Sequence, residues 1–494
     1  MECRLELKAL KNIKKIVISK RHSLIVASAF MAICLATIAL SDGMMFRNQP
    51  DSAGYIKFSA IRSSAYPMFI RLHSYLFSEI DFLIVSQVIL YSLSFFYLMY
   101  IIHERLGNIF FVSISFGIGI SLNIYLQAYH LVILTESLVF TLMNVFLACF
   151  IKLKDQKNLS LMILLGIIAG SLFALKPAMI TMILILPFVM LYLGSKDLII
   201  CSKSIFVTLL ATLSIVIVER AIYRNFHDQN RSLLPLTLQG KAAILTSYSD
   251  FVYPSIDKDQ TSALIAWDKT LTPFEAWSSG ERNKFLVRNL TSNFEVLSQY
   301  GEKNLIERYN VIKLTDKQKV GMGISTILAN PRIYLKHSMG HMISLWSVHE
   351  LAFMGFFSGL ELPQFSDKFL QSAVPGDGAV EQYLDPNSIN AFSLLSIVVF
   401  PMFLSLGVIN FFILTLHGFR IILSAGVHTI IISQKQKLVF VLSGVGWLNL
   451  VFVAFVNISS PRYLMPVLPF ILLATLISIS DIFEKLRTLR SVKC

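Results

Sequence analysis

The sequence comprises 494 residues, of which 55% are apolar and 15% are charged, and its mean hydropathy is +0.66. Soluble domains carry about 25% charged residues, so this composition excludes a soluble globular protein and indicates an integral membrane protein. The net charge of +13 lies mostly in short segments beside apolar runs, where membrane topology explains it and no nucleic-acid partner is expected.

A basic N-terminal segment precedes the first apolar run, at about 23–41. This run is longer than a signal-peptide core and no clear cleavage site follows it, so we expect a retained signal anchor with its N-terminus inside. The next loop, 42–81, is long and dense in charged residues and tyrosines. Apolar residues at helical spacing on either side of Pro67 predict amphipathic helices that lie on the outer membrane interface.

Further apolar runs follow, and most approach the roughly 20 residues that cross a hydrocarbon core. Lys and Arg gather in the loops between alternate runs, which sets the orientation of the chain. The sequence therefore predicts an all-α polytopic membrane protein with about ten transmembrane helices, and a count of up to about thirteen stays open. After the first run, we place the spans at 82–102, 108–126, 131–151, 159–175, 178–194, 204–219, 391–416, 438–456 and 463–482.

Between about 220 and 390 the sequence changes character, because its first hundred residues are polar and interrupted by prolines. The segment is too long for a simple connector, so we predict an extracytoplasmic loop domain that is α-rich or mixed. We interpret 333–358, which is rich in histidine, as an interfacial or re-entrant helix. The predicted domains are an N-terminal transmembrane module, 1–219, with a catalytic first outer loop, 42–81; a loop region, 220–390; and a C-terminal transmembrane module, 391–494.

Several ionisable residues collect on the outer face in this topology. Such residues are costly at membrane depth and are functional candidates by default. An acid facing outward suits a general base, and fixed cations stabilise the developing charge of a phosphate. The residues concerned are Asp51, Arg62, Arg71, Glu136, Lys176, Arg220, Lys336, His337, His341 and Arg462.

Four short motifs occur in a fixed order along the chain. They are D-S-A-G-Y with R-S-S-A-Y-P (51–67), L-T-E-S-L (134–138), L-K-P (175–177) and S-P-R-Y-L-M-P-V-L-P (460–469). This set resembles the GT-C superfamily of polytopic membrane glycosyltransferases, whose first outer loop commonly carries D-S-x-x-Y and then R-x-x-x-Y-P. Lys176 stands where the family often has Arg, and Ser52 stands where protein O-mannosyltransferases have a second acid. The resemblance covers the spans and the first loop but not 221–390.

The resemblance implies an inverting glycosyltransferase of the bacterial cell envelope, in the inner (cytoplasmic) membrane with its active site facing the extracytoplasmic side. The enzyme would transfer a sugar from a polyprenyl-phosphate-linked donor to a glycan, lipid or protein acceptor. Asp51 would be the general base. The donor phosphate is assigned to Arg62, Lys176, Arg462, Lys336 and His337, with support from Tyr55, Tyr66, Arg71, Glu136 and Tyr463. No cofactor is expected beyond the donor, while a divalent metal stays open.

Each assignment has a structural alternative. Asp51 alternatively caps a helix that begins near Ser52, and the two arginines of the first loop alternatively snorkel to the interface. Glu136 is alternatively a buried structural acid. His337 and His341 share one helical face, but without a third ligand they make a poor metal site.

Two other functions stay open for the whole protein. An O-antigen-type polymerase shares the many spans and the large outer loop, but centres its catalytic cations in that large loop. A transporter or flippase predicts polar residues at mid-span and paired broken helices. The acid in the first loop and the apolar centres of the spans favour the transferase over both.

Overall fold

The computed structural model describes residues 2–42, 52–59, 62–77, 79, 81–106, 110–153, 158–193, 198–227, 234–246, 248, 250–270, 314–346, 386–426, 433–456 and 463–492. Within these ranges 88% of the residues are helical and no strand occurs, so the all-α prediction is confirmed there. The chain divides into two compact units. The first comprises Met1–Asp228, Leu406–Asn449 and Met465–Cys494, and the second comprises Gln229–Ser405 and Leu450–Leu464.

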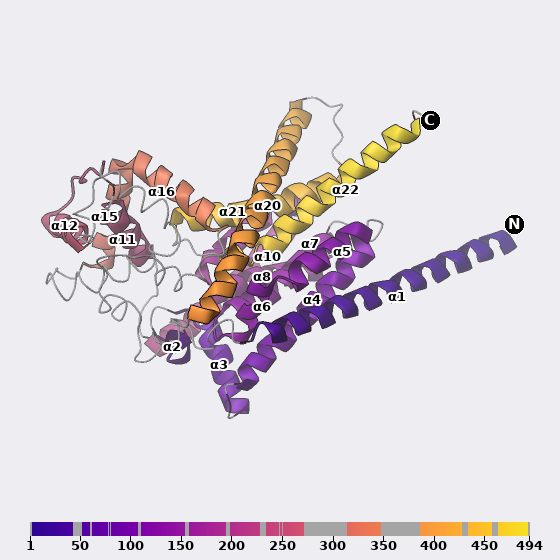
Figure 1. The fold of residues 1–494 in the computed structure, drawn as a ribbon, viewed down its shortest axis with the longest axis horizontal. Helices are drawn as coiled ribbons and strands as arrows, with labels where there is room; N and C mark the ends of the chain where they lie inside the picture. Colours follow the sequence, from indigo (N-terminus) through magenta and orange to yellow (C-terminus); the bar gives the residue numbers. More distant parts are fainter. Residues whose placement is uncertain are drawn as a thin grey trace. The chain divides into compact units, whose positions relative to one another are not determined.

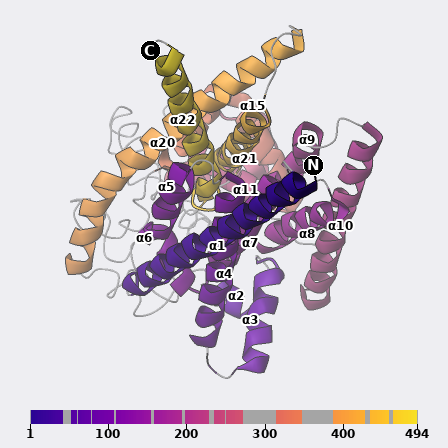
Figure 2. The same ribbon diagram turned by 90° about the vertical axis from the view of Figure 1, so that its right-hand side faces the viewer.

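Long helices dominate the first unit. Helix α1 packs against α4, and α4 packs against α7. Figures 1 and 2 show these helices from two sides. The helices that belong wholly to this unit are α1 (Glu2–Leu40), α2 (Ser52–Ile56), α3 (Ala65–Leu76), α4 (Asp81–Leu106), α5 (Phe110–Ser121), α6 (Ile124–Ala128), η1 (Tyr129–Leu131), α7 (Glu136–Leu153), α8 (Leu159–Leu175), η2 (Pro177–Met179), α9 (Ile180–Leu193), α10 (Leu198–His227) and α22 (Leu468–Val492). Two more helices, α20 (Pro386–Gly426) and α21 (Gln434–Val456), contribute residues to both units.

Six helices in the described part of the chain are long and apolar enough to cross a membrane: Lys20–Leu40, Asp81–Leu106, Glu136–Leu153, Ile199–His227, Met402–Ile421 and Gln434–Val456. The chain is therefore a membrane-embedded helical protein, as its composition predicts. The remaining predicted spans also fall on helices, but Phe110–Ser121, Leu159–Leu175 and Pro177–Met190 are shorter. At a rise of about 1.5 Å per residue, a helix of this length does not by itself reach across a hydrocarbon core. The count of ten spans therefore stays a prediction.

Helices α8 and α10 pack closely against each other within the first unit. A side chain on Gly170 of α8 would lie 2.8 Å from the carbonyl oxygen of Thr212 in α10. The hydroxyl of Thr212 donates across the same contact to the carbonyl of Gly166, at 3.0 Å. Small residues four apart with cross-helix hydroxyl donors are a common way to pack helices tightly in a membrane. This packing fixes the C-terminal end of α8 against α10.

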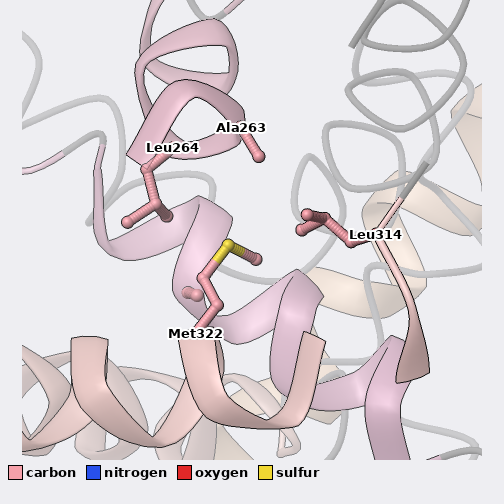
Figure 3. Packing of buried hydrophobic residues seen from close by; sticks show 5 residues of the cluster. Ala263, Leu264, Leu314 and Met322 are labelled. Atoms are coloured by element: carbon pink, nitrogen blue, oxygen red, sulfur yellow. The ribbon is translucent and has the colours of Figure 1, made fainter. Parts of the chain in front are cut away.

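Apart from its share of α20 and α21, the described part of the second unit contains shorter helices: α11 (Leu234–Leu245), α12 (Lys258–Thr270), α15 (Asp316–Ala329) and α16 (Pro331–Ser344). Their apolar core consists of Ala242, Ala263, Leu264, Leu314 and Met322, and Figure 3 shows the last four of these side chains converging. A capping box at Thr315 and Gln318 begins α15. The described part of the predicted loop region 220–390 is thus helical, and α16 covers the first part of the predicted 333–358 helix, whose residues from 347 onward lie outside the described part.

Candidate active site

The beginning of the first loop is attached to the segment that precedes α7. Ser52, the first residue of α2, is buried, and its hydroxyl donates to the main-chain carbonyl of Ile133 at 2.8 Å. Ile133 directly precedes the L-T-E-S-L motif. Asp51 itself lies outside the described residues. Its neighbour Ser52 nevertheless joins the first motif to the second.

The R-S-S step is held by two different helices. The hydroxyl of Ser63 donates to the carbonyl of Leu175 at 2.8 Å, at the end of α8. The backbone N–H and the hydroxyl of Ser64 both approach Oε1 of Glu219 in α10, at 3.1 and 3.2 Å. Both serines and Glu219 are buried. The first motif is therefore also joined to the L-K-P motif, which begins at Leu175.

Arg62 folds back onto the D-S-A-G-Y motif. Its guanidinium carbon lies 4.7 Å from the centroid of the Tyr55 ring, a cation–π contact. A Cβ atom on Gly54 would lie 3.0 Å from Nε of Arg62, so a larger residue at this position would require the arginine side chain to shift by a few tenths of an ångström. The Tyr55 ring in turn stands edge-on to Tyr66, with centroids 5.2 Å apart. Two predicted site residues, Arg62 and Tyr55, are thus in contact.

Tyr66 is wholly buried and joins α3 to α4. Its hydroxyl donates to Oε1 of Gln87 at 2.7 Å, and Nε2 of Gln87 donates to the carbonyl of Val132 at 3.1 Å. Burial, together with the nearby charge of Glu136 and the neighbouring Tyr55, raises the pKa of Tyr66 well above its ordinary value. The phenol therefore stays protonated and acts as a hydrogen-bond donor. Tyr66 supports the loop in this role.

Glu136 and Lys176 form a buried ion pair. Nζ of Lys176 lies 2.8 Å from Oε1 of Glu136, and the side chains are 9% and 3% exposed. Thr135 donates to the second carboxylate oxygen at 3.2 Å. Glu136 begins α7, where the helix dipole favours a negative charge. The pair joins L-T-E-S-L directly to L-K-P, so that three of the four motifs meet in one network.

Arg71 and its surroundings differ from the rest of the predicted site. The guanidinium of Arg71 lies 4.3 Å from the ring of Phe226 and 5.5 Å from that of Phe58, and the side chain is exposed. Phe58 has a φ of +49°, which a bulky side chain rarely adopts. Its ring also packs against His227, at 4.6 Å. These contacts anchor the loop between α2 and α3 to the end of α10.

Arg220 lies in α10 of the first unit, with Nε 3.9 Å from Oε2 of Glu219. The remaining predicted residues belong to the second unit or lie outside the described ranges. His337 is buried, with Nδ1 3.1 Å from the hydroxyl of Tyr248. Burial lowers the pKa of His337 well below its ordinary value, and the charge of Lys241 lowers it further, so the imidazole is neutral near pH 7. Lys336 is exposed above the Tyr248 ring, and Tyr463 is buried. Arg462 lies outside the described residues.

Sequence reasoning missed several polar groups. Gln87, Ser63, Ser64 and Glu219 hold the first loop, and Lys241 forms a buried cluster with two histidines in the second unit. A carboxylate at the end of an apolar run of the sequence, as at Glu219, was a visible signal. Among the described residues, no group of three or more His, Cys, Asp or Glu side chains is arranged to hold a metal ion. A comparison with family models, curated proteins and solved structures finds no match to the chain.

Proposed function

We propose that this protein is a membrane glycosyltransferase that uses a polyprenyl-phosphate-linked sugar as its donor. The supporting observation is that three motifs of the family resemblance, which are far apart in the sequence, lie together in the first unit. The hydrogen bonds of Ser52 and Ser63 and the Glu136–Lys176 ion pair join them. Motifs that match a family by chance have no reason to meet in space.

The proposed reaction is an inverting displacement at the anomeric carbon. The carboxylate of Asp51 takes the proton of an acceptor hydroxyl, and the acceptor oxygen forms a bond to the anomeric carbon. The bond from that carbon to the phosphate oxygen breaks, and the polyprenyl phosphate leaves with the electron pair. Arg62 and Lys176 stabilise the charge that develops on the leaving phosphate. Arg462, Lys336 and His337 remain further candidates for the same role.

The topology that goes with this function has ten spans and places the first loop outside the inner membrane. The region 220–390 then forms an extracytoplasmic loop domain that helps to select the acceptor. The acceptor is a glycan, a lipid or a protein of the envelope. The clustering of Lys and Arg in the alternate loops supports this orientation. A cysteine placed near Asn283 should react with an impermeant thiol reagent added from outside only.

Replacing Asp51 with asparagine tests the mechanism. General-base catalysis contributes about 10²- to 10⁴-fold, so Asp51→Asn should lower the transfer rate by this factor while insertion and folding persist. Transfer is measured in membranes with a panel of radiolabelled polyprenyl-phosphate sugars. Asp42→Asn is the matched control, because Asp42 is an exposed acid at the end of the first span. Normal transfer by the Asp51 variant would overturn the mechanism.

A flippase would give a different result when the purified protein is reconstituted with a labelled lipid-linked sugar. Wild-type protein in liposomes would then move a labelled lipid between leaflets without forming a glycosidic bond. A polymerase would extend a lipid-linked glycan instead of adding one sugar to an acceptor. Either result would replace the proposed function.

A further inference from the structure

Glu219 is a buried acid in a largely apolar helix, where a carboxylate is unfavourable unless polar partners contact it. It lies within α10, which is long and apolar enough to cross a membrane. Oε1 of Glu219 accepts the N–H and the hydroxyl of Ser64, at 3.1 and 3.2 Å. Its other oxygen, Oε2, lies 3.9 Å from Nε of the neighbouring Arg220. A buried carboxylate needs such partners, and here the partners that come from outside α10 lie in the first loop.

Ser63 and Ser64 contact two different helices. Ser63 is bound to the end of α8 through the carbonyl of Leu175, while Ser64 is bound to α10 through Glu219. The two helices are packed tightly against each other at Gly170. This pair of contacts, the serine clamp, therefore has a rigid base. It fixes the chain at residues 63 and 64 against both helices.

The serine clamp lies between the two proposed phosphate ligands of the first unit. Arg62 directly precedes Ser63, and Lys176 directly follows Leu175, the residue that Ser63 contacts. One hydrogen bond thus joins the immediate neighbours of both cations. Loss of the Glu219 carboxylate would leave only the 3.2 Å contact from the Ser64 hydroxyl to the main-chain carbonyl of Glu219. One side of the clamp would then be weakened, and the segment that carries Arg62 could move.

We propose that Glu219 is a positioning residue that holds Arg62 at a fixed spacing from Lys176, so that both cations bind one phosphate group. This inference rests on the proposed function. Glu219 does not touch the phosphate and acts through Ser64. A carboxylate suits the role because hydrogen bonds to a charged acceptor are stronger than those to a neutral one.

Binding of undecaprenyl phosphate tests this role, because the carrier is the common product for every donor of this class. The full-length protein in nanodiscs is titrated with the carrier. Glu219→Ala should weaken binding about ten-fold, which corresponds to the loss of one charge-assisted hydrogen bond. Glu219→Gln keeps an acceptor oxygen and should restore most of the affinity. Ser64→Ala should weaken binding less, because the N–H of residue 64 still donates to Glu219.

The decisive measurement repeats the substitution in an Arg62→Ala background. If Glu219 acts through Arg62, then Glu219→Ala should have no further effect there, because the two losses are not additive. An equal ten-fold loss in both backgrounds would show that Glu219 acts elsewhere and would overturn the proposal. Unchanged binding in Glu219→Ala alone would overturn it as well.

Hydrogen exchange separates a failure of this proposal from a failure of the proposed function. The amide of Ser64 donates to Glu219, so its exchange should accelerate at least about ten-fold in Glu219→Ala and much less in Glu219→Gln. A wild-type protein that does not bind undecaprenyl phosphate would overturn the proposed function. If the Ser64 amide exchanged equally slowly in all variants, the positioning role would be overturned, whether or not the protein binds the carrier.

Discussion

Replacing Lys241 with methionine should remove the rise in the free energy of unfolding of the second unit between pH 7 and 9. Lys241 is 2% exposed. Its Nζ lies 2.9 Å from Nδ1 of His341 and donates to the carbonyl of Ala454 at 3.0 Å. Burial lowers the pKa of Lys241 from 10.5 to about 7. Burial therefore favours the neutral form of the lysine in the folded protein.

The sign of the effect follows from the two pKa values. Between about pH 7 and 10.5 the unfolded chain binds a proton at Lys241 that the folded chain does not bind. The free energy of unfolding therefore rises with pH across this window, by about 1.4 kcal/mol per pH unit. From pH 7 to pH 9 the expected gain is roughly 2 kcal/mol, because at pH 7 the folded chain still binds about half a proton at Lys241. Lys241→Met removes this contribution, so the free energy of unfolding of the variant should not rise with pH across this window.

The groups around Lys241 act outside this window. Burial, and then the charge of Lys241, lower the pKa of His337 and His341, so stability falls further as the pH drops below the ordinary histidine range. Burial, followed by the charge of Asp250, raises the pKa of Tyr248 to about 12. The unfolded chain therefore loses that proton first, and stability falls again above about pH 10. Lys336 lies over the Tyr248 ring but is exposed.

The assay is urea unfolding of the purified protein in micelles, followed by the fluorescence of the buried Trp346 after subtraction of a Trp346→Phe variant. Lys336→Met serves as the control, because it removes an exposed lysine from the same helix that carries His341. The control should keep the wild-type slope against pH. The reasoning is refuted if the free energy of unfolding of the wild-type protein does not change between pH 7 and 9. It is also refuted if the free energy of unfolding of Lys241→Met rises with pH as steeply as that of the wild type.

Two further predictions concern packing and charge in the first unit. Gly170→Ala should destabilise the protein by about 1–3 kcal/mol through overpacking, since the new Cβ would lie 2.8 Å from a carbonyl of α10. Gly444→Ala meets nothing within 4 Å and should be neutral or stabilising in the same thermal unfolding assay. Glu136→Gln and Lys176→Met should each cost about 3–5 kcal/mol by leaving one buried charge, whereas the double variant should regain stability but not transfer activity. Equal stability of single and double variants would contradict the buried pair.

Hydropathy located the helices because lipid contact and backbone hydrogen bonding leave few other structures for an apolar segment. The span predicted at 159–175 coincides with α8, and the sequence carries a signal for each end of this helix. Asn158 caps its first turn by accepting from Leu161, and Pro177 follows its end. The span predicted at 204–219 lies inside a longer helix, Leu198–His227. Hydropathy indicates which residues of a helix are apolar enough to lie in the membrane. The helix itself continues until a capping or helix-breaking residue ends it.

The family motifs predicted which segments form the candidate site, but not how they are held together. The Glu136–Lys176 pair links two motifs that were assigned different roles, and no spacing rule predicts a contact between residues forty positions apart. The serine contacts are still less visible, because every residue offers a carbonyl such as that of Leu175. The buried position of Lys241 was equally hidden. Lysine in a polar stretch ordinarily indicates a solvated surface.

The motifs that meet in the first unit lie where the long helices are interrupted. The segment 129–135 separates α6 from α7, and Lys176 separates α8 from η2. Interrupted backbone at membrane depth is tolerated only where protein or a cavity supplies hydrogen bonds. Ser52, Ser63 and Gln87 donate to carbonyls at these two breaks. The same hydrogen bonds therefore satisfy the broken backbone and locate the loop that carries Asp51 and Arg62, which explains why a change at one of these three donors should affect both folding and function.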